Sequence, residues 1–233
     1  MSQITIAIDG YAGTGKSSTA KAVAKALGYT YIDTGAMYRA VTMYLLDHNI
    51  PFEDNSPALL AALDQIHLDF RPGKQVGDLE IYLNDAPAEP AIRDPRISKA
   101  VSPVAALTAV RNLMVAQQRR IGEHGGVVMD GRDIGTYVFP HADLKVFMTA
   151  SVDIRTQRRQ AELALSGIDP GFEEIQANLQ ERDKIDSTRA MAPLKQASDA
   201  VLIDSSGISF EEQVKTVIQL AESRIQQNNL PPQ

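Results

Sequence analysis

Nine residues near the start of the chain, Gly10 to Ser18, have the residue types and spacing of a phosphate-binding loop. They match the pattern G-x-x-x-x-G-K-[ST], in which glycines let the backbone curl so that successive N–H groups point at phosphate oxygens. By that pattern Lys16 reaches the β- and γ-phosphates of a nucleoside triphosphate, and the Ser17 hydroxyl binds Mg²⁺. The predicted ATP-binding residues of the loop are Gly10, Tyr11, Ala12, Gly13, Thr14, Gly15, Lys16, Ser17 and Ser18.

The segments that flank this loop supply the context that it requires. Ile4–Ile8 is a β-branched, largely apolar run that predicts a buried strand, and Ser17–Leu27 is rich in alanine and lysine and predicts a helix. The N-terminal end of that helix adds positive charge for an anion. The alternative is a glycine-rich turn before an ordinary helix. A phosphate cradle by itself does not reveal what is done with the phosphate.

A second set of polar residues follows the next predicted strand, Tyr29–Asp33. This strand leads through Thr34 and Gly35 into a predicted helix over Ala36–Asp47, whose first turn carries Arg39. In open sheets of parallel strands, ligands gather at the C-terminal ends of the strands. We therefore expect Arg39 to form a second anion site at the same edge as the P-loop, and not to be a solvated helix arginine.

A third predicted strand, Val127–Asp130, leads into the charged turn Gly131–Thr136 at the same edge. Asp130 ends the apolar run but is followed by Gly131, not by the glutamate that a water-activating ATPase carries there. The sequence therefore assigns no carboxylate to the metal, and Ser17 is the one metal ligand that it predicts.

The remaining segments complete an alternation of strands and helices. Leu144–Met148 and Ala200–Asp204 predict two more strands, Ser98–Ile121 predicts one long helix, and a capping box at Ser209 starts the last helix. Strands that alternate with helices imply a parallel sheet covered on both faces. The predicted fold class is α/β, a P-loop three-layer fold with a five-stranded parallel sheet.

Two segments fall outside this alternation. Residues 51–95 are punctuated by prolines, and the alternating runs His67–Phe70 and Leu79–Leu83, joined through residues 73–77, predict a β-rich insertion. Residues 153–190 predict two helices joined by a glycine–proline turn at Ser166–Gly171, which we interpret as a helical lid over a triphosphate. The alternative is a solvated charged hairpin. The arginines of this segment are Arg155, Arg158, Arg159, Arg182 and Arg189. The core is then assigned to residues 1–50, 96–152 and 191–233.

Composition excludes several classes of protein. The 233 residues are 44% hydrophobic, which is enough for a core, and the net charge of −6 argues against a nucleic acid polymer as the main partner. The chain has no cysteine, so it forms no disulfides and no thiolate metal sites. It has no apolar run of about 18 residues and no signal-like N-terminus. We expect a cytoplasmic protein that does not bind a membrane.

The charged turns distinguish among P-loop proteins. A kinase needs cations between two anionic substrates, and Arg39, Arg132, Arg182 and Arg189 supply them beside the P-loop. A GTPase switch needs an N-K-x-D segment, and no Asn-Lys pair occurs in the chain. The sequence therefore favours a kinase of two phosphorylated substrates.

Four segments together resemble the bacterial cytidylate kinase family. They are the P-loop, Asp33–Arg39, Asp130–Thr136 and the run from Glu181 to Leu194, and in this order they extend over nearly the whole chain. The Gly-Arg-Asp-x-Gly-Thr turn is the most distinctive. The chain departs mildly from the family at Ser17-Ser18, where a Gly-Thr or Ser-Thr pair is usual, but it keeps the metal-side hydroxyl.

This resemblance implies transfer of the γ-phosphoryl group of ATP to CMP or dCMP by a monomer, with Mg²⁺ as cofactor and an enlarged nucleoside monophosphate domain over 51–95. Arg39, Arg132 and Arg189 would hold the acceptor phosphate, and the three lid arginines Arg155, Arg158 and Arg159 would close on ATP. The implied catalytic residues are Lys16, Arg132, Arg182 and Arg189. The implied CMP-binding residues are Thr34, Tyr38, Arg39, Ser102, Arg111, Arg132, Asp133, Arg182, Asp186 and Arg189.

The chemistry of cytosine agrees with the implied base-reading residues Ser102, Arg111 and Asp133. Cytosine presents an amino donor beside two acceptors, so a carboxylate and a guanidinium are its complements. Uracil would turn a carbonyl oxygen toward the carboxylate. On spacing alone, Asp133 could equally cap a turn and Arg111 could equally form a helix salt bridge.

Two further functions stay open: a P-loop kinase of another phosphorylated or polyol metabolite, and an ATP-dependent regulatory module with little turnover.

Overall fold

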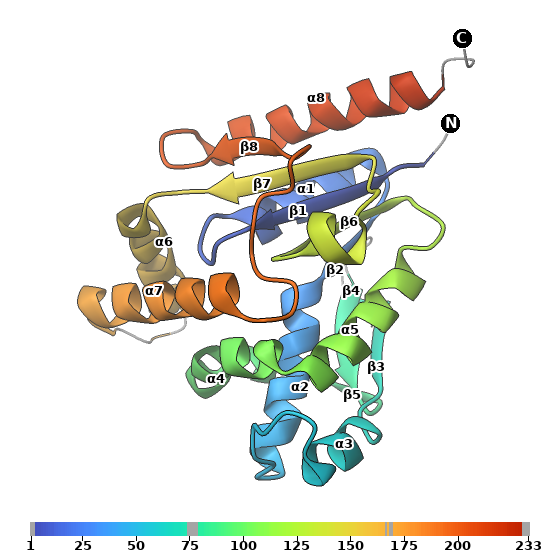
Figure 1. Cartoon of the computed structure of the whole chain (residues 1–233). Helices are drawn as coiled ribbons and strands as arrows, with labels where there is room; N and C mark the ends of the chain where they lie inside the picture. Colours follow the sequence, from blue (N-terminus) through green and yellow to red (C-terminus); the bar gives the residue numbers. More distant parts are fainter. Residues whose placement is uncertain (1–2, 74–78, 166, 168–169, 230–233) are drawn as a thin grey trace.

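The computed structural model describes residues 3–73, 79–165, 167 and 170–229. Five parallel strands form the main sheet: β1 (Thr5–Gly10), β2 (Thr30–Asp33), β6 (Val127–Gly131), β7 (Leu144–Thr149) and β8 (Val201–Asp204). Their order is β2-β6-β1-β7-β8 (Figure 1). The predicted five-stranded parallel sheet is confirmed. Because β1 lies at the centre, the loop that follows it opens at the middle of the sheet edge.

Helices cover both faces of this sheet. On one face α1 (Lys16–Leu27) and α8 (Phe210–Asn228) pack against Ile6 and Ile8, and on the other face Ala7 packs against Val115 of a later helix. Alternate residues of β1 thus enter opposite layers, as the period of two in a strand requires. The predicted capping box is present, since Ser209 and Glu212 bond reciprocally.

The strand register brings several acidic residues to one edge. Asp130 pairs with Ile8 of β1 on one side and with Asp33 of β2 on the other. Asp33 also caps α2 (Thr34–Asp47) by accepting a hydrogen bond from the Ala36 N–H. The C-terminal ends of β1, β2 and β6 therefore meet at the start of two helices, α1 and α2.

The helix predicted over residues 98–121 is two helices, so this prediction is wrong. α4 (Pro95–Ala106) ends at Leu107, which has an extended backbone, and α5 (Thr108–Ile121) begins immediately after it. The break is stabilised by Asp54, whose carboxylate accepts hydrogen bonds from the N–H groups of Thr108 (3.0 Å) and Ala109 (3.1 Å). A cap supplied by a residue 54 positions away leaves no signal in the local periodicity.

Replacing Asp54 with alanine should lower the free energy of unfolding by about 1 kcal/mol, the usual value of a helix cap. Slight burial would raise the pKa of Asp54, but the hydrogen bonds from Thr108 and Ala109 outweigh it and lower the pKa. The stabilisation is therefore present above the ordinary aspartate pKa and is lost as the pH falls through the lowered pKa of the folded protein. Urea unfolding at pH 7 and at pH 3 measures both effects. An equal difference between the variant and the unaltered protein at the two pH values would contradict the capping role.

The predicted β-rich insertion is present as a second, antiparallel sheet. It contains β3 (Leu68–Pro72), β4 (Leu79–Leu83) and β5 (Ala86–Pro87), in that order, preceded by α3 (Pro57–Leu63) and followed by a short helical turn, η1 (Ala91–Arg93). The short strand β5 was not predicted; it forms because Asn84 and Asp85 both adopt positive φ and turn the chain back tightly. Most of the predicted connection over 73–77 lies outside the described residues.

One apolar cluster joins this insertion to its neighbours. Leu59 and Ile81 from the insertion pack together with Val41 of α2, Val104 of α4 and Met114 of α5. The cluster therefore crosses the boundary drawn at residues 51 and 95. The division of the chain into 51–95, 153–190 and a core stays a prediction.

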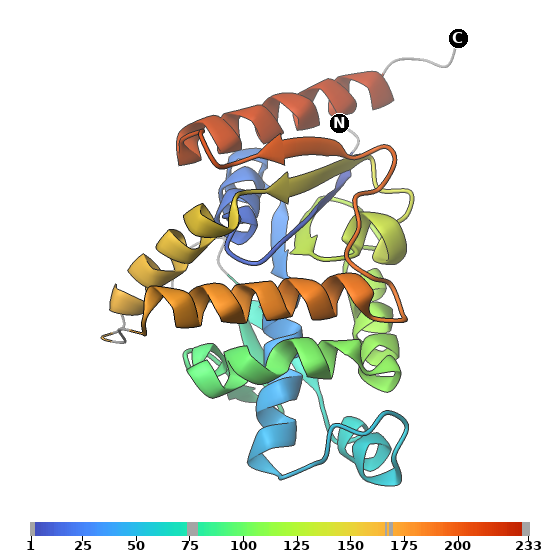
Figure 2. The same ribbon diagram turned by 60° about the vertical axis from the view of Figure 1, so that its left-hand side comes forward.

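The two helices of the predicted lid are α6 (Val152–Leu165) and α7 (Phe172–Thr188). Of the predicted turn between them, only residues 167, 170 and 171 are described. Figure 2 shows α7 crossing between the main sheet and α4. Ile175 and Leu179 of α7 pack against Ala12 of the P-loop. In the described part of the chain, no helix is long and apolar enough to span a membrane.

Candidate active site

A cavity of about 900 Å³ lies between the main sheet, the small sheet and the two lid helices. It is lined by most of the side chains that the sequence singled out. These are Ala12, Gly13, Gly15, Lys16, Ser17, Ser18, Thr34, Tyr38, Arg39, Ser102, Arg132, Asp133, Arg159, Arg182, Asp186 and Arg189. Such a volume is sufficient for more than one small ligand. The predicted residues Gly10, Tyr11, Thr14, Arg111, Arg155 and Arg158 lie outside its lining.

The P-loop has the curled backbone that its glycines predict. Gly13 and Gly15 have φ values of 79° and 86°, and a Cβ on Gly10 would lie 2.1 Å from the carbonyl oxygen of Met148. A side chain at Gly10 would therefore push β1 away from β7. The Tyr11 carbonyl oxygen accepts hydrogen bonds from Lys16 Nζ (3.2 Å) and Thr14 Oγ1 (3.0 Å).

Lys16 is a buried cation that no carboxylate contacts directly among the described residues. Burial and then the positive charge of Arg132, with a smaller contribution from Arg182, lower the pKa of its amino group to about 7. Lys16, Arg132 and Arg182 all line the same cavity, so their positive charges repel one another across it. An anion bound between them would relieve this repulsion.

Asp130 lies beside the predicted metal ligand. The Ser17 hydroxyl donates to Asp130 Oδ2 at 2.7 Å, and the Tyr31 hydroxyl donates to Oδ1 at 2.9 Å. Burial and then the charge of Asp33 raise the pKa of Asp130. Burial and then the charges of Asp130 and Asp33 raise the pKa of Tyr31, so its phenol stays a donor. Sequence reasoning assigned no role to Asp130 or Tyr31. The available signal was the apolar run that ends in Asp130 on a strand parallel to β1.

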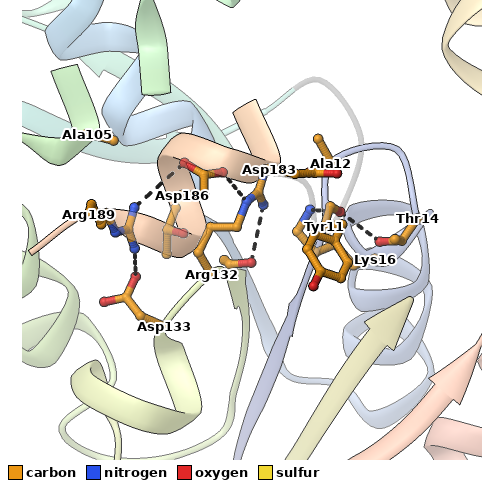
Figure 3. A network of polar contacts seen from close by, with 12 residues as sticks. Tyr11, Ala12, Thr14, Lys16, Ala105, Arg132, Asp133, Asp183, Asp186 and Arg189 are labelled. Atoms are coloured by element: carbon orange, nitrogen blue, oxygen red, sulfur yellow. Dashed lines mark hydrogen bonds and ion pairs between the residues drawn. The ribbon is translucent and has the colours of Figure 1, made fainter. Parts of the chain in front are cut away.

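The predicted acceptor-phosphate arginines each contact an aspartate. Two of these pairs, Arg132–Asp186 and Arg189–Asp133, come together where α7 meets the turn after β6 (Figure 3). The pairs and their N–O distances are Arg39–Asp33 (2.8 Å), Arg132–Asp186 (2.8 Å) and Arg189–Asp133 (2.9 Å). Each arginine therefore has an anionic partner that a phosphate could replace.

Asp186 illustrates the strength of these pairs. Burial alone would raise its pKa, but the charges of Arg132, Arg189 and Arg182 outweigh burial and lower the pKa. Arg182 has no ion pair among the described residues, and its buried Nε has no hydrogen-bond partner. Burial and the charge of Arg132 lower the pKa of Arg182 to about 10. A half-buried guanidinium with no ion pair in the cavity lining is well placed to bind an anion.

The predicted base-reading pair is in direct contact. Arg111 is fully buried and donates to Asp133 Oδ2, while Arg189 contacts the other oxygen of the same carboxylate. Ser102 is also buried and lines the cavity beside them, as does Tyr38, whose hydroxyl has no hydrogen-bond partner among the described residues. Thr34 is present at the edge, but its hydroxyl donates to the Asp130 carbonyl oxygen at 2.6 Å.

The predicted ATP-binding arginines of the lid occupy two different environments. Arg155 donates to the Ala12 carbonyl oxygen (3.2 Å) and to Asp183 (2.6 Å), and Arg158 donates to the Thr14 carbonyl oxygen (3.2 Å). Both hold the backbone of the P-loop, whereas Arg159 lines the cavity. The contact of Arg155 and Arg158 with ATP phosphates stays a prediction.

Asp9, a buried acid that the sequence analysis did not single out, binds the backbone of the charged turn Gly131–Thr136. Asp9 accepts hydrogen bonds from the N–H groups of Ile134 and Gly135, both at 2.8 Å. These bonds fix the start of the short helical turn η2 (Ile134–Val138), immediately after Asp133. Burial raises the pKa of Asp9 to about 7 despite these two bonds. Its signal was a lone acid in an otherwise apolar strand.

Comparison with known sequences identifies one family. The family model described as Cytidylate kinase matches residues 6–223. A cytidylate kinase of Bacteroides fragilis is 50% identical over 215 residues, which cover 91% of this chain and 94% of the relative. Those of Phocaeicola vulgatus and Anoxybacillus flavithermus are 48% and 45% identical, with 97% and 96% of this chain and 99% and 98% of the relatives covered.

Proposed function

Because this chain belongs to the cytidylate kinase family, we propose that it transfers the γ-phosphoryl group of ATP to CMP or dCMP, giving ADP and CDP or dCDP. The chain is a kinase, and the family supports CMP as its acceptor. ATP as the donor and dCMP as a second acceptor are the more specific parts of the proposal. The observation that carries it is the convergence of Lys16 with Arg132 and Arg182 on one cavity.

Phosphoryl transfer needs positioning and charge neutralisation more than covalent chemistry. In the proposed mechanism the P-loop N–H groups and Lys16 hold the β- and γ-phosphates of the donor. Arg39, Arg132 and Arg189 leave their aspartates and hold the acceptor phosphate in line. The attacking oxygen is already anionic, so no general base is required.

The residues around Ser17 fit the Mg²⁺ ion that accompanies ATP. The Ser17 hydroxyl and the Asp130 carboxylate are hard oxygen ligands 2.7 Å apart. Mg²⁺ in kinases is held by one or two carboxylates, substrate phosphates and water, and no cluster of three or more potential ligating His, Cys, Asp or Glu occurs in the described part of the chain. When bound, the ion would neutralise charge on the donor phosphates. Ser17 and Asp130 would hold it.

The choice of cytosine is assigned to Asp133 and Arg111. Arg111 contacts one oxygen of the Asp133 carboxylate; when Arg189 turns to the acceptor phosphate, the other oxygen is available to accept from an exocyclic amine. Uracil would place a carbonyl oxygen against that carboxylate, and an unpaired buried charge costs roughly 2–5 kcal/mol.

We also propose that Arg182 and Asp186 contact the sugar. The two substrate sites are both formed by one chain, so we propose a monomer; ATP and CMP are cytoplasmic metabolites, so we propose action in the cytoplasm.

A coupled assay of ADP release tests the proposal with four acceptors: CMP, dCMP, UMP and AMP. We expect strong stimulation by CMP and dCMP, weak stimulation by UMP and least by AMP, because an amino group must face Asp133 in a pyrimidine-sized site. The rate of ADP release without any acceptor gives the background of ATP hydrolysis. Equal or absent stimulation by all four would rule out the cytidylate assignment and favour a kinase of another metabolite or a regulatory module.

A further inference from the structure

Asp130 is held at three points, and one of them belongs to no motif. Ser17 donates to Oδ2 (2.7 Å) as part of the P-loop, and Thr34 donates to the main-chain oxygen (2.6 Å) from the start of α2. The third contact comes from Tyr31, whose hydroxyl donates to Oδ1 at 2.9 Å. With both oxygens occupied, the carboxylate plane has one orientation.

The sheet register explains how Tyr31 reaches this carboxylate. β2 and β6 are parallel neighbours in which Tyr31 pairs with Val128 and Asp33 pairs with Asp130. Side chains two residues apart in a strand point to the same face, so Tyr31 and Asp130 share a face, one strand and two residues apart. With strands about 4.8 Å apart and a rise of about 3.3 Å per residue, their Cα atoms are roughly 8 Å apart, which a phenol can span. Phenylalanine would fill the same space without a donor.

Two neighbouring charges of opposite sign, Asp33 and Lys16, act on the Asp130 carboxylate. Asp33 lies directly opposite on the neighbouring strand, and its negative charge acts on Asp130, while Lys16 attracts Asp130 from the P-loop side. A carboxylate between a like charge and a cation would turn toward the cation unless it were tied. The Tyr31 hydroxyl ties Oδ1 and leaves Oδ2 beside the Ser17 hydroxyl, in the lining of the cavity.

We propose that Tyr31 is a positioning residue that orients Asp130, and that it thereby sets the affinity of the enzyme for the divalent cation that accompanies the donor nucleotide. The inference rests on the proposed function, in which Ser17 and Asp130 hold that cation. Outer partners of metal-binding carboxylates typically change metal affinity by about 10- to 100-fold when they are removed. Tyr31 touches neither nucleotide in this proposal; it acts through Asp130.

The test is Tyr31→Phe with Mn²⁺ as the probe. Mn²⁺ is titrated into a complex of the enzyme with a non-hydrolysable ATP analogue, and electron paramagnetic resonance measures the Mn²⁺ that remains free. We expect Mn²⁺ binding to weaken by about 10-fold or more, and binding of the analogue in excess chelator to stay within about 2-fold. The control is Tyr29→Phe, which should leave Mn²⁺ binding unchanged. Tyr29 lies just before β2, the strand that contains Tyr31, and its hydroxyl accepts a hydrogen bond from the Ile4 N–H.

A double mutant separates positioning from a general loss of structure. In the Asp130→Asn background, Tyr31→Phe should weaken Mn²⁺ binding by less than 2-fold further, because the residue it acts through is already altered. Tyr31→Leu, a second variant without the hydroxyl, should behave like Tyr31→Phe. Unchanged Mn²⁺ affinity in Tyr31→Phe, or equal losses in both backgrounds, overturns the proposal. These titrations need no turnover, so failure of the acceptor assay is a separate result.

Discussion

Replacing Lys16 with methionine should lower kcat for phosphoryl transfer to CMP by about 10³-fold, the upper part of the range for loss of one preorganised charge contact in a closed site. Lys16 is buried, and among the described residues its amino group donates only to the Tyr11 carbonyl oxygen. Its charge is therefore available to the donor phosphates. Methionine keeps the length of the side chain and removes the charge. Steady-state kinetics with saturating ATP and CMP measures the loss.

The same substitution should stabilise the ligand-free protein. The pKa of Lys16 is lowered from 10.5 to about 7 by burial and by Arg132. Between these pH values the unfolded chain holds the proton and the folded chain releases it, so the folded state loses stability as the pH falls through this window. Near pH 7 methionine should therefore raise the free energy of unfolding by roughly 1–3 kcal/mol, and the gain should shrink as the pH approaches 10.

Lys25→Met is the matched control, because Lys25 lies exposed on the same helix, α1. It should change neither kcat nor, beyond about 0.5 kcal/mol, the free energy of unfolding. A Lys16→Met enzyme with kcat within 10-fold of the unaltered enzyme would contradict the assigned role of Lys16. A loss of stability in Lys16→Met would instead contradict the view that burial of its charge opposes folding.

Replacing Asp133 with asparagine should be the most destabilising of the substitutions considered, lowering the free energy of unfolding by about 3–5 kcal/mol. Asp133 is nine-tenths or more buried and contacts Arg111 and Arg189 at once. Removing its charge leaves the buried Arg111 without an ion pair among the described residues and leaves Arg189 with Asp186 alone, at 3.9 Å. Urea unfolding measures the loss. Asp47→Asn is the control, because its pair with Arg96 is exposed and should be worth at most about 1 kcal/mol.

Asp133→Asn should also reduce the preference for CMP over UMP. If Asp133 contributes about 2 kcal/mol to discrimination, the ratio of the two kcat/KM values should fall by about 30-fold. The assay should be run in the cold, where a destabilised variant is still folded, and folding should be checked by circular dichroism. A folded Asp133→Asn enzyme with an unchanged ratio would show that the base is read elsewhere.

Residues close together in the sequence carried most of the correct predictions. The P-loop, its strand and its helix follow from glycine spacing and from the alternation of apolar residues over short distances. The capping box at Ser209 likewise depends on a neighbour three positions away. Such signals survive in a sequence because the interacting groups are separated by few bonds. The single long helix over 98–121 was wrong because its break depends on Asp54.

The partners of the charged residues could not be read in the same way. The sequence placed Arg39 and Arg132 just after predicted strands at one edge, and the family resemblance implied that Arg189 joins them at the acceptor phosphate. It did not indicate that Asp33, Asp186 and Asp133 neutralise them. The contacts made by Asp186 and Asp133 depend on where α7 crosses the sheet edge, whereas Asp33 lies only six residues before Arg39. Arg155 and Arg158 were assigned to ATP, and only the fold shows that they hold P-loop carbonyl oxygens.

The sequence by itself predicted the α/β sheet and the phosphate-loop pattern at Gly10–Ser18, and its resemblance to a family indicated the acceptor. The tertiary structure decided which acid stands beside Ser17. Asp130 reaches that hydroxyl because β6 pairs with β1 in a register that sets Asp130 beside Ile8, and Tyr31 reaches Asp130 because β2 pairs with β6. Strand order and register arise from packing of the whole core, so no single segment of the chain encodes them.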